Sequence, residues 1–286
     1  MNAMTDLSRA VDLHVHSTAS DGTYTPAELV QLAVSAGLSA FALTDHDTIA
    51  GISEAKLAAA DCGCEVISGV ELSCDYNGRE VHMVGLFIDE TDPALLAELA
   101  SFNERRIERN KEMVRRLQAE GLAITYEGLL ADNHDRVITR GNIAKYLVDH
   151  QLVRDNPTVF SRYLGDDCRC FVPREKISPG QAIRIIHAAG GLAILAHPLL
   201  YHMNLEQLRD FLALLKADGL DGMEAIYSTF QPGDERNMKR IAGELDLLIS
   251  GGSDFHGSNK PHIRLGTGMG RLFVPYEALE MLKQHL

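Results

Sequence analysis

Short apolar runs alternate along this chain with longer segments of helical periodicity. The runs are rich in Val, Ile, Leu and Ala and lie near residues 11–16, 39–44, 65–72, 80–88, 192–196, 221–226 and 246–252. Runs of this length and composition predict buried strands. The first two and the last three are followed by helical patterns such as TPAELVQLAVSAG and LEQLRDFLALLKADG. Repeated strand-helix units predict an α/β barrel.

Two regions interrupt this rhythm. The pair Asn77-Gly78, between the third and fourth runs, is a strong tight-turn signal, so these two strands are expected to form a hairpin-like excursion from an irregular barrel. Residues 100–190 carry almost no strand signal and begin with the charged helical pattern SFNERRIERNKEMVRRLQAEG. We therefore predict a barrel domain at residues 1–99 and 191–286, and an inserted helical subdomain at 100–190 that caps the active-site end and contacts the substrate.

The composition is that of a globular enzyme. The chain has 286 residues, of which 45% are hydrophobic and 23% charged. No run approaches the length of a membrane span, and the N-terminal MNAMTDLSRA lacks the apolar segment of a secretion signal, so we expect a cytoplasmic protein without a membrane partner. The chain has five cysteines, and four of them form two Cys-x-Cys pairs. Because the number is odd and the pairs are few, we expect the cysteines to pack in the fold rather than form disulfides.

The formal net charge of −13 excludes one class of partner. Proteins that hold long nucleic acid on a broad basic surface must neutralise many phosphates, so binding to long duplex DNA is not expected. A local positive site remains open, because three divalent ions beside three carboxylates leave a charge of roughly +3. Such a site would attract a small phosphorylated anion.

Histidines and carboxylates gather at the ends of the apolar runs. They occur in VDLHVHSTASDG, FALTDHDTIAG, VISGVELS, EVHMVGLF, AILAHP and LISGGSDFHG. Imidazole and carboxylate together suit zinc, manganese or iron, and the C-terminal strand ends of a barrel carry its chemistry. The pattern indicates a multinuclear metal hydrolase. The predicted ligands are His14, His16, Asp21, His46, Glu71, His82, His197, Asp254 and His256.

The spacing within two of these segments supports a shared ion. Because side chains alternate along a strand, His14 and His16 lie on the same face, one pleat apart, and both imidazoles can reach one ion. Asp254 and His256 repeat this spacing near the end of the chain. Asp21 follows in a Ser/Gly-rich loop, where a helix-capping or turn role stays equally open from the residues alone.

The ordered motifs HVHSTASDG, TDHD, GVELS followed by a His, AHP and SDFHG resemble those of the PHP family, named for polymerase and histidinol phosphatase domains, within the amidohydrolase superfamily. The resemblance spans the chain from His14 to about Gly266. Within the family, the chain is most similar to the 3′,5′-nucleotide bisphosphate phosphatases, which are related to bacterial enzymes that trim RNA from its 5′ end. The resemblance implies a distorted (β/α)7 barrel.

The resemblance also implies a site for two to three divalent ions, with manganese favoured and iron or zinc as alternatives. In it, His14, His16, Glu71 and Asp254 would hold the first ion, Glu71 would bridge to a second ion held by His82 and His197, and Asp21, His46 and His256 would hold the third. Some relatives have His at the position of Asp21, and a carboxylate there favours manganese or iron over zinc.

Such a site would hydrolyse phosphate esters. Two ions that share Glu71 can keep a bridging water as a metal-bound hydroxide near neutral pH, and they neutralise charge on the phosphoryl oxygens. Protonation of the leaving group needs a further residue, and His197 and Asp254 are the catalytic candidates for that role.

The candidates for substrate binding lie in the segment TRGNIAKYL of the insertion. Arg140 stands where a helix is expected to begin, and a guanidinium beside free backbone N–H groups is a natural phosphate receptor. Relatives carry a similar Arg in their insertion. Asn142 and Lys145 are further candidates, and an Arg before a helix that only faces solvent is the alternative interpretation.

Three functions follow from these observations. The favoured one is a phosphatase that removes the 3′-phosphate from nucleoside 3′,5′-bisphosphates, converting adenosine 3′,5′-bisphosphate to AMP and phosphate. The second is a 5′-to-3′ exoribonuclease on short 5′-phosphorylated RNA, and the third is a non-catalytic metal-binding module. Both enzymatic functions need a pocket for a 5′-phosphate and ions at the 3′ ester, so the sequence leaves them open.

Overall fold

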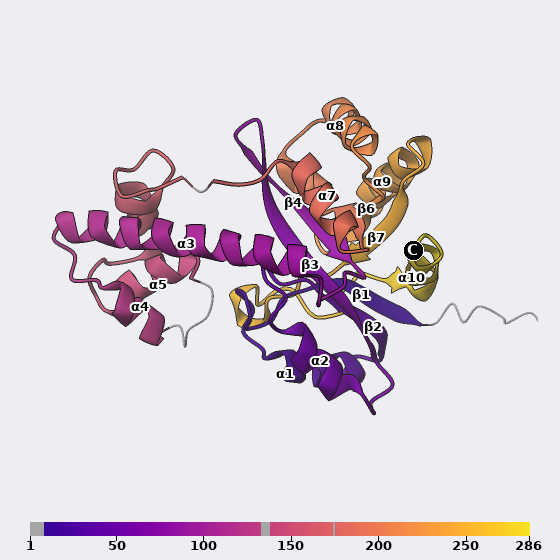
Figure 1. The fold of residues 1–286 in the computed structure, drawn as a ribbon, viewed down its shortest axis with the longest axis horizontal. Helices are drawn as coiled ribbons and strands as arrows, with labels where there is room; N and C mark the ends of the chain where they lie inside the picture. The colour runs from indigo at the N-terminus through magenta and orange to yellow at the C-terminus, as the bar shows by residue number, and fades with distance from the viewer. Residues whose placement is uncertain (1–8, 133–137, 174) are drawn as a thin grey trace, which may run out of the picture. The chain divides into compact units, whose positions relative to one another are not determined.

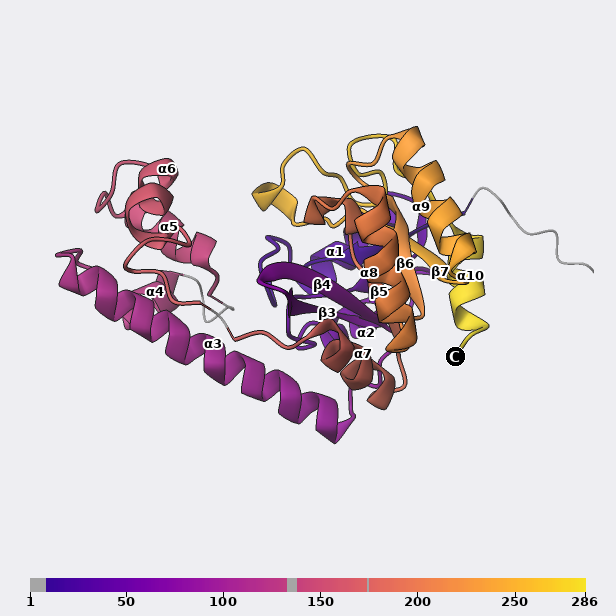
Figure 2. The same cartoon turned by 90° about the horizontal axis from the view of Figure 1, so that it is seen from above.

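The computed structural model describes residues 9–132, 138–173 and 175–286, which fall into two compact units. Unit 1 comprises Met1–Leu96 and Lys176–Leu286, and unit 2 comprises Ala97–Glu175. Figures 1 and 2 show the chain from two directions.

Unit 1 is built on one eight-stranded sheet with the order β7-β6-β5-β4-β3-β2-β1-β8. Its strands are β1 (Ala10–Val15), β2 (Leu38–Leu43), β3 (Glu65–Tyr76), β4 (Arg79–Leu86), β5 (Leu192–Leu195), β6 (Gly222–Tyr227), β7 (Leu248–Gly252) and β8 (Val274–Pro275). The first seven overlap the predicted apolar runs, and β3 extends beyond its run to Tyr76. The two-residue β8, which pairs antiparallel with β1, was not expected from the sequence.

The sheet closes almost completely into a barrel. Val15 at the end of β1 bridges in parallel to Phe255, just after β7. The backbone N–H of Asp254 donates to the carbonyl of His14 at 2.9 Å, and that of His16 donates to the carbonyl of Phe255 at 3.0 Å. These contacts join the end of β1 to the segment that follows β7, and the expected distorted α/β barrel is confirmed.

The distortion comes from the hairpin of β3 and β4. These strands are antiparallel and in register from Gly69↔Leu86 to Tyr76↔Arg79. Asn77 and Gly78 turn the chain with φ values of 55° and 77°, as a tight hairpin turn requires. Because β4 also runs antiparallel to β5, it is reversed within an otherwise mainly parallel barrel.

The helices of unit 1 surround this sheet (Figures 1 and 2). They are α1 (Pro26–Ser35), α2 (Ile52–Ala59), α7 (Pro179–Ala188), α8 (Leu205–Ala217), α9 (Pro232–Glu244) and α10 (Tyr276–Lys283). Thr25, Ser178 and Asn204 begin α1, α7 and α8 with capping boxes that satisfy their first backbone donors. One apolar cluster joins residues of β1 to β6 with α10, so the barrel has a continuous core.

Unit 2 is helical and has its own core. It holds most of α3 (Pro93–Ala119), together with α4 (Tyr126–Asp132), α5 (Arg140–Asp149), α6 (Asn156–Val159) and a π-helical turn at Phe160–Leu164. Its buried residues include Met113, Leu117, Ile143 and Leu147. Helix α7 belongs to unit 1, where its residue Ile186 packs against Gly85. The substrate-capping role of the region 100–190 stays a prediction.

Among the described helices, none is both long and apolar enough to cross a membrane.

Candidate metal centre

The structure brings all nine predicted ligands together at one end of the barrel. His14 lies on β1, Glu71 on β3 and His82 on β4, and the others follow β1, β2, β5 and β7 in loops. Their nitrogen and oxygen atoms form groups in which all members lie within 4.8 Å of one another. These groups are His16, Asp21, His46 and His256; His14, Glu71 and His197; His14, His16 and Asp254; and His46, Glu71 and His82.

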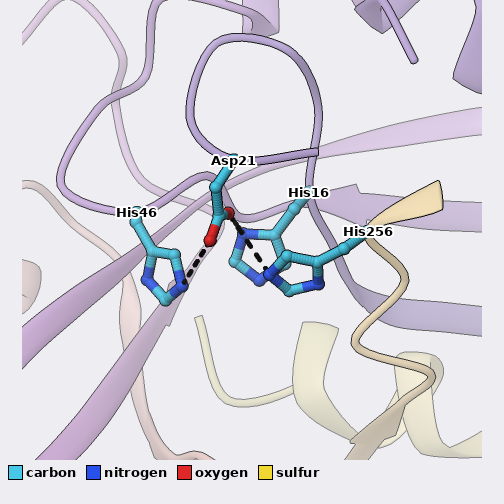
Figure 3. A group of neighbouring side chains, drawn as sticks. All are labelled: His16, Asp21, His46 and His256. Carbon is cyan, nitrogen blue, oxygen red and sulfur yellow. Dashed lines mark ion pairs between the residues drawn. The ribbon is translucent and has the colours of Figure 1, made fainter. Parts of the chain in front are cut away.

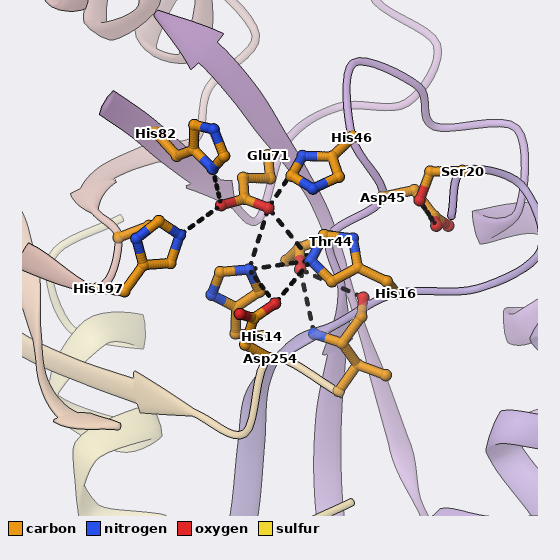
Figure 4. Close-up of polar contacts among 12 residues, drawn as sticks. His14, His16, Ser20, Thr44, Asp45, His46, Glu71, His82, His197 and Asp254 are labelled. Atoms are coloured by element: carbon orange, nitrogen blue, oxygen red, sulfur yellow. Dashed lines mark hydrogen bonds and ion pairs between the residues drawn. The ribbon is translucent and has the colours of Figure 1, made fainter. Parts of the chain in front are cut away.

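Glu71 stands at the centre of the cluster (Figure 4). Its Oε2 atom lies 3.2 Å from Nε2 of His14 and 3.1 Å from Nε2 of His16. Its Oε1 atom lies 2.8 Å from Nδ1 of His82 and 3.0 Å from Nε2 of His197. Oε2 also lies 3.1 Å from Nδ1 of His46. The two oxygens of one carboxylate therefore face separate sets of imidazoles, which is the arrangement needed to bridge two cations.

Asp254 completes the group around His14 and His16. Its Oδ1 atom lies 3.7 Å from Nε2 of His14 and 3.4 Å from Nε2 of His16. The other carboxylate oxygen, Oδ2, accepts hydrogen bonds from Tyr227 Oη at 2.6 Å and Lys260 Nζ at 2.7 Å. These two donors orient the carboxylate so that Oδ1 faces the histidines.

A third group forms around Asp21 (Figure 3). Its Oδ1 atom lies 3.2 Å from Nε2 of His256, and its Oδ2 atom lies 3.9 Å from Nε2 of His46. His16 stacks on His256 with ring centroids 4.0 Å apart, and its Nδ1 atom lies 3.8 Å from Asp21. The two nitrogens of His16 thus face different groups, which the strand alternation did not predict.

The donor atoms fit divalent cations. Among the described residues, the buried ring nitrogens His16 Nδ1 and His197 Nδ1 have no hydrogen-bond partner. A buried polar atom without a partner costs about 1–3 kcal/mol, so a compensating ligand is expected. Imidazole nitrogens and carboxylate oxygens are the donors that zinc, manganese and iron take in proteins.

The electrostatics of the cluster are dominated by Glu71. Burial alone would raise the pKa of its carboxyl, but the charges of neighbouring imidazoles, among them His14 and His82, hold that pKa well below its ordinary value. Burial lowers the pKa of His46 to about 3, which leaves a neutral imidazole available to a metal. Burial by itself would lower the pKa of His82, but the negative charge of Glu71 and the hydrogen bond to Glu71 raise the pKa of His82 to about 10. Protons and cations therefore compete for this site.

Two buried acids that support the cluster were missed by the sequence reasoning. Asp12 on β1 accepts the backbone N–H groups of Ser253 and Gly266, each at 2.7 Å, and burial raises its pKa to about 6. Glu224 on β6 contacts Nδ1 of His14 and accepts the backbone N–H of His197. The available signal was an acidic residue inside an otherwise apolar strand.

Asp45, beside the predicted ligand His46, orders the loop that carries Asp21. It accepts the backbone N–H of Ser17 at 2.8 Å and the hydroxyl of Ser20 at 2.5 Å (Figure 4). These bonds satisfy a fully buried carboxylate. Asp45 therefore orders this loop through both a backbone N–H and serine hydroxyl groups.

The three predicted substrate-binding residues have local partners in unit 2. Arg140 begins α5, and its Nη1 atom donates to Asp166 Oδ1 at 2.5 Å and to the carbonyl of Leu164 at 3.2 Å. The Asn142 side chain accepts the N–H of Thr139 in a capping box, and Lys145 pairs with Asp149. The substrate roles of Arg140, Asn142 and Lys145 stay predictions.

Comparisons with known proteins agree with this geometry. The PHP domain matches residues 12–165. The chain is 45% identical to a 5′-3′ exoribonuclease of Haemophilus influenzae, over 87% of this chain and 91% of that protein. It is 38% identical to a 3′,5′-nucleoside bisphosphate phosphatase of Chromobacterium violaceum, over 86% of this chain and 87% of that protein.

A solved structure extends the agreement to the fold. The crystal structure described as a putative metal-dependent phosphoesterase from Bifidobacterium adolescentis superposes with a TM-score of 0.81 and 30% identity, covering 96% of each chain. Sequence, fold and the cluster of His, Asp and Glu side chains thus lead to one assignment. The chain belongs to the PHP family and is a metal-dependent phosphoesterase.

Proposed function

We propose that this protein removes the 3′-phosphate from nucleoside 3′,5′-bisphosphates, converting adenosine 3′,5′-bisphosphate to AMP and phosphate. The observation that carries the proposal is the position of Glu71 between two pairs of imidazoles, His14 with His16 and His82 with His197. The net charge of −13 favours a small anionic substrate over a long phosphate backbone.

The nine clustered residues would hold two to three divalent cations, with manganese favoured and iron or zinc as alternatives. When bound, such cations supply a nucleophilic water and neutralise charge on the phosphoryl group. Glu71 would hold two of them at a fixed separation. His197 and Asp254 are the candidates for giving a proton to the departing 3′-oxygen as its bond to phosphorus breaks. Tyr227 and Lys260 hold the second oxygen of Asp254.

A 5′-to-3′ exoribonuclease acting on short 5′-phosphorylated RNA is the second candidate. It is favoured by the 45% identity to the Haemophilus influenzae protein, whereas the 38% identity to the Chromobacterium violaceum phosphatase favours the first. Both reactions attack a phosphorus at the 3′-oxygen of a 5′-phosphorylated nucleotide. They differ in whether the phosphate carries another nucleotide.

A steady-state comparison separates the two candidates. Manganese-loaded enzyme would be given adenosine 3′,5′-bisphosphate or a short 5′-phosphorylated oligoribonucleotide, and kcat/KM would be measured for each. A higher kcat/KM on the bisphosphate is expected. A higher value on the oligonucleotide would make the exoribonuclease the function. Adenosine 3′-phosphate tests the need for the 5′-phosphate, and the Glu71→Gln variant provides the inactive control.

A further inference from the structure

Strand β6 supplies none of the nine predicted ligands, yet one of its side chains contacts two of them. Glu224 lies on β6 with its side chain 1% exposed. Its Oε1 atom is 2.7 Å from Nδ1 of His14, and its Oε2 atom accepts the backbone N–H of His197 at 2.6 Å. Both oxygens of this carboxylate are therefore occupied, each by a different predicted ligand.

The contact with His14 determines which ring nitrogen can bind a cation. A carboxylate only accepts, so the nitrogen facing Glu224 must carry the proton. That nitrogen is Nδ1, which leaves the lone pair of the neutral ring on Nε2. Nε2 is the atom that faces Glu71 and His16. Glu224 therefore selects the tautomer of His14 that points a lone pair into the cluster.

The contact with His197 restrains its backbone. His197 has φ 27° and ψ 57°, a left-handed conformation that a residue with a Cβ rarely adopts. The hydrogen bond from its N–H to Glu224 secures this conformation at the end of β5. The side chain then points Nε2 toward Glu71 Oε1 at 3.0 Å.

We propose that Glu224 is a positioning residue that prepares two cation sites at once, through the ring of His14 and the backbone of His197. The proposal rests on the ligand roles predicted for these histidines and does not depend on which phosphate ester is the substrate. His14 belongs to the predicted first site and His197 to the second, so the loss of Glu224 should weaken both.

The Glu224→Gln variant tests this with almost no change in volume. Its amide has one acceptor oxygen and one NH2 group, so it cannot accept from both His14 and His197. If the NH2 group faces His14, the ring must carry its proton on Nε2, where it blocks a cation. We expect the affinity for manganese, measured by competition with a chelator, to fall by about 10- to 100-fold.

Asp221→Asn is the matched control. Asp221 also joins a histidine ring to a backbone N–H, because its Oδ2 atom lies 2.7 Å from His187 Nε2 and accepts the N–H of Ala193 at 2.7 Å. Neither partner belongs to the predicted ligand set. The manganese affinity of this variant should stay within about twofold of the parent protein. An equal loss in both variants would mean that Glu224 only supports the barrel, and an unchanged affinity in Glu224→Gln would overturn the proposal.

A measurement on the unmutated protein tests the predicted tautomer of His14 even if Glu224→Gln does not fold. In zinc-loaded protein, which is diamagnetic, ¹⁵N NMR of His14 should show a protonated Nδ1 and an unprotonated Nε2. A proton on Nε2 would overturn the proposal. These readouts report metal affinity and tautomer, so they hold whichever substrate the kinetic comparison selects.

Discussion

The Nδ1 atom of His82 lies 2.8 Å from Oε1 of Glu71, across the antiparallel pair of β3 and β4. The hairpin register aligns Glu71 with Val84 and His82 with Ser73, so the two side chains meet diagonally. The hairpin that distorts the barrel thus brings a histidine of the reversed strand to the central carboxylate. The centre depends on this register as much as on the residue types.

Replacing Glu71 by Gln should abolish most of the activity and leave the fold intact. The amide loses the negative charge that faces both pairs of imidazoles, so both predicted cations are held less tightly. We expect kcat to fall by at least about 10²- to 10³-fold, together with a lower metal content by elemental analysis. His14→Ala should behave in the same way. Full activity in a Glu71→Gln variant of normal circular dichroism would contradict the bridging role.

Asp21→Ala should have a milder effect than the loss of Glu71. Asp21 lies at the edge of the cluster and its side chain is 26% exposed, against 1% for Glu71. If the group around Asp21 contributes only part of the charge stabilisation, activity should fall by about 10- to 10³-fold. Steady-state rates and metal content would be measured together. A fully active variant with unchanged metal content would mean that Asp21 is a turn residue and not a metal ligand.

Removal of metal should abolish activity reversibly. The mixture of six imidazoles and three carboxylates predicts two to three ions per chain, and activity after chelation should recover best with manganese. Elemental analysis of active protein gives the number directly. Fewer than one ion per active chain would rule out a multinuclear centre.

Metal affinity should fall as the pH is lowered. In the metal-free protein, burial by itself would lower the pKa of His16, but the hydrogen bonds that its ring donates to Asp254 and Glu71, together with the negative charge of Glu71, raise this pKa to about 9. The pKa of His82 is raised to about 10. Both rings are therefore doubly protonated at pH 7, and a cation must displace the second proton from each ring that it binds. The binding constant should rise by up to about tenfold per pH unit for each proton released.

Calorimetry in buffers of different ionisation enthalpy measures this release. We expect one to two protons to leave per cation bound between pH 6 and pH 8, with the number decreasing above pH 9 as His16 loses its proton in the free protein. Binding without proton release at pH 7 would mean that the two imidazoles are already neutral.

Arg140→Ala tests the predicted grip on the second phosphate. The variant should raise KM for adenosine 3′,5′-bisphosphate by about 10- to 150-fold, the size of one lost charge-assisted contact of about 1.5–3 kcal/mol. An aryl phosphate lacks the second phosphate, so its KM should change little. Equal losses on both substrates would assign Arg140 to the reacting phosphate, and no loss on either would leave it a structural partner of Asp166.

Asp166→Asn is the complementary variant. Asp166 accepts a hydrogen bond from Arg140 at 2.5 Å. Its carboxylate would therefore compete with a bound phosphate for the Arg140 side chain. Its neutralisation should lower KM for the bisphosphate and leave KM for the aryl phosphate unchanged. An increase for the bisphosphate would mean that Asp166 orients Arg140 rather than competes for it.

Local pattern was sufficient for much of the fold and for the membership of the cluster. Apolar runs place seven strands, because burial imposes their composition, and Asn77-Gly78 determines the hairpin turn, because its two positive φ values suit few residue pairs. The pleat places His14 and His16 on one face. Ordered motifs identify all nine clustered residues.

Barrel closure determines the long-range contacts of the centre, which the local sequence pattern does not predict. Glu224 reaches His14 across 210 positions of sequence, and Asp12 accepts the N–H of Ser253 across 241. The two-residue β8 is defined by its pairing with β1, and the second nitrogen of His16 meets Asp21 in a loop that folds back onto Asp45. Local periodicity carries no information about such contacts, since they depend on which strands become neighbours when the sheet closes. The residue types of the centre are thus set by sequence, and their pairing, tautomers and charge states by tertiary structure.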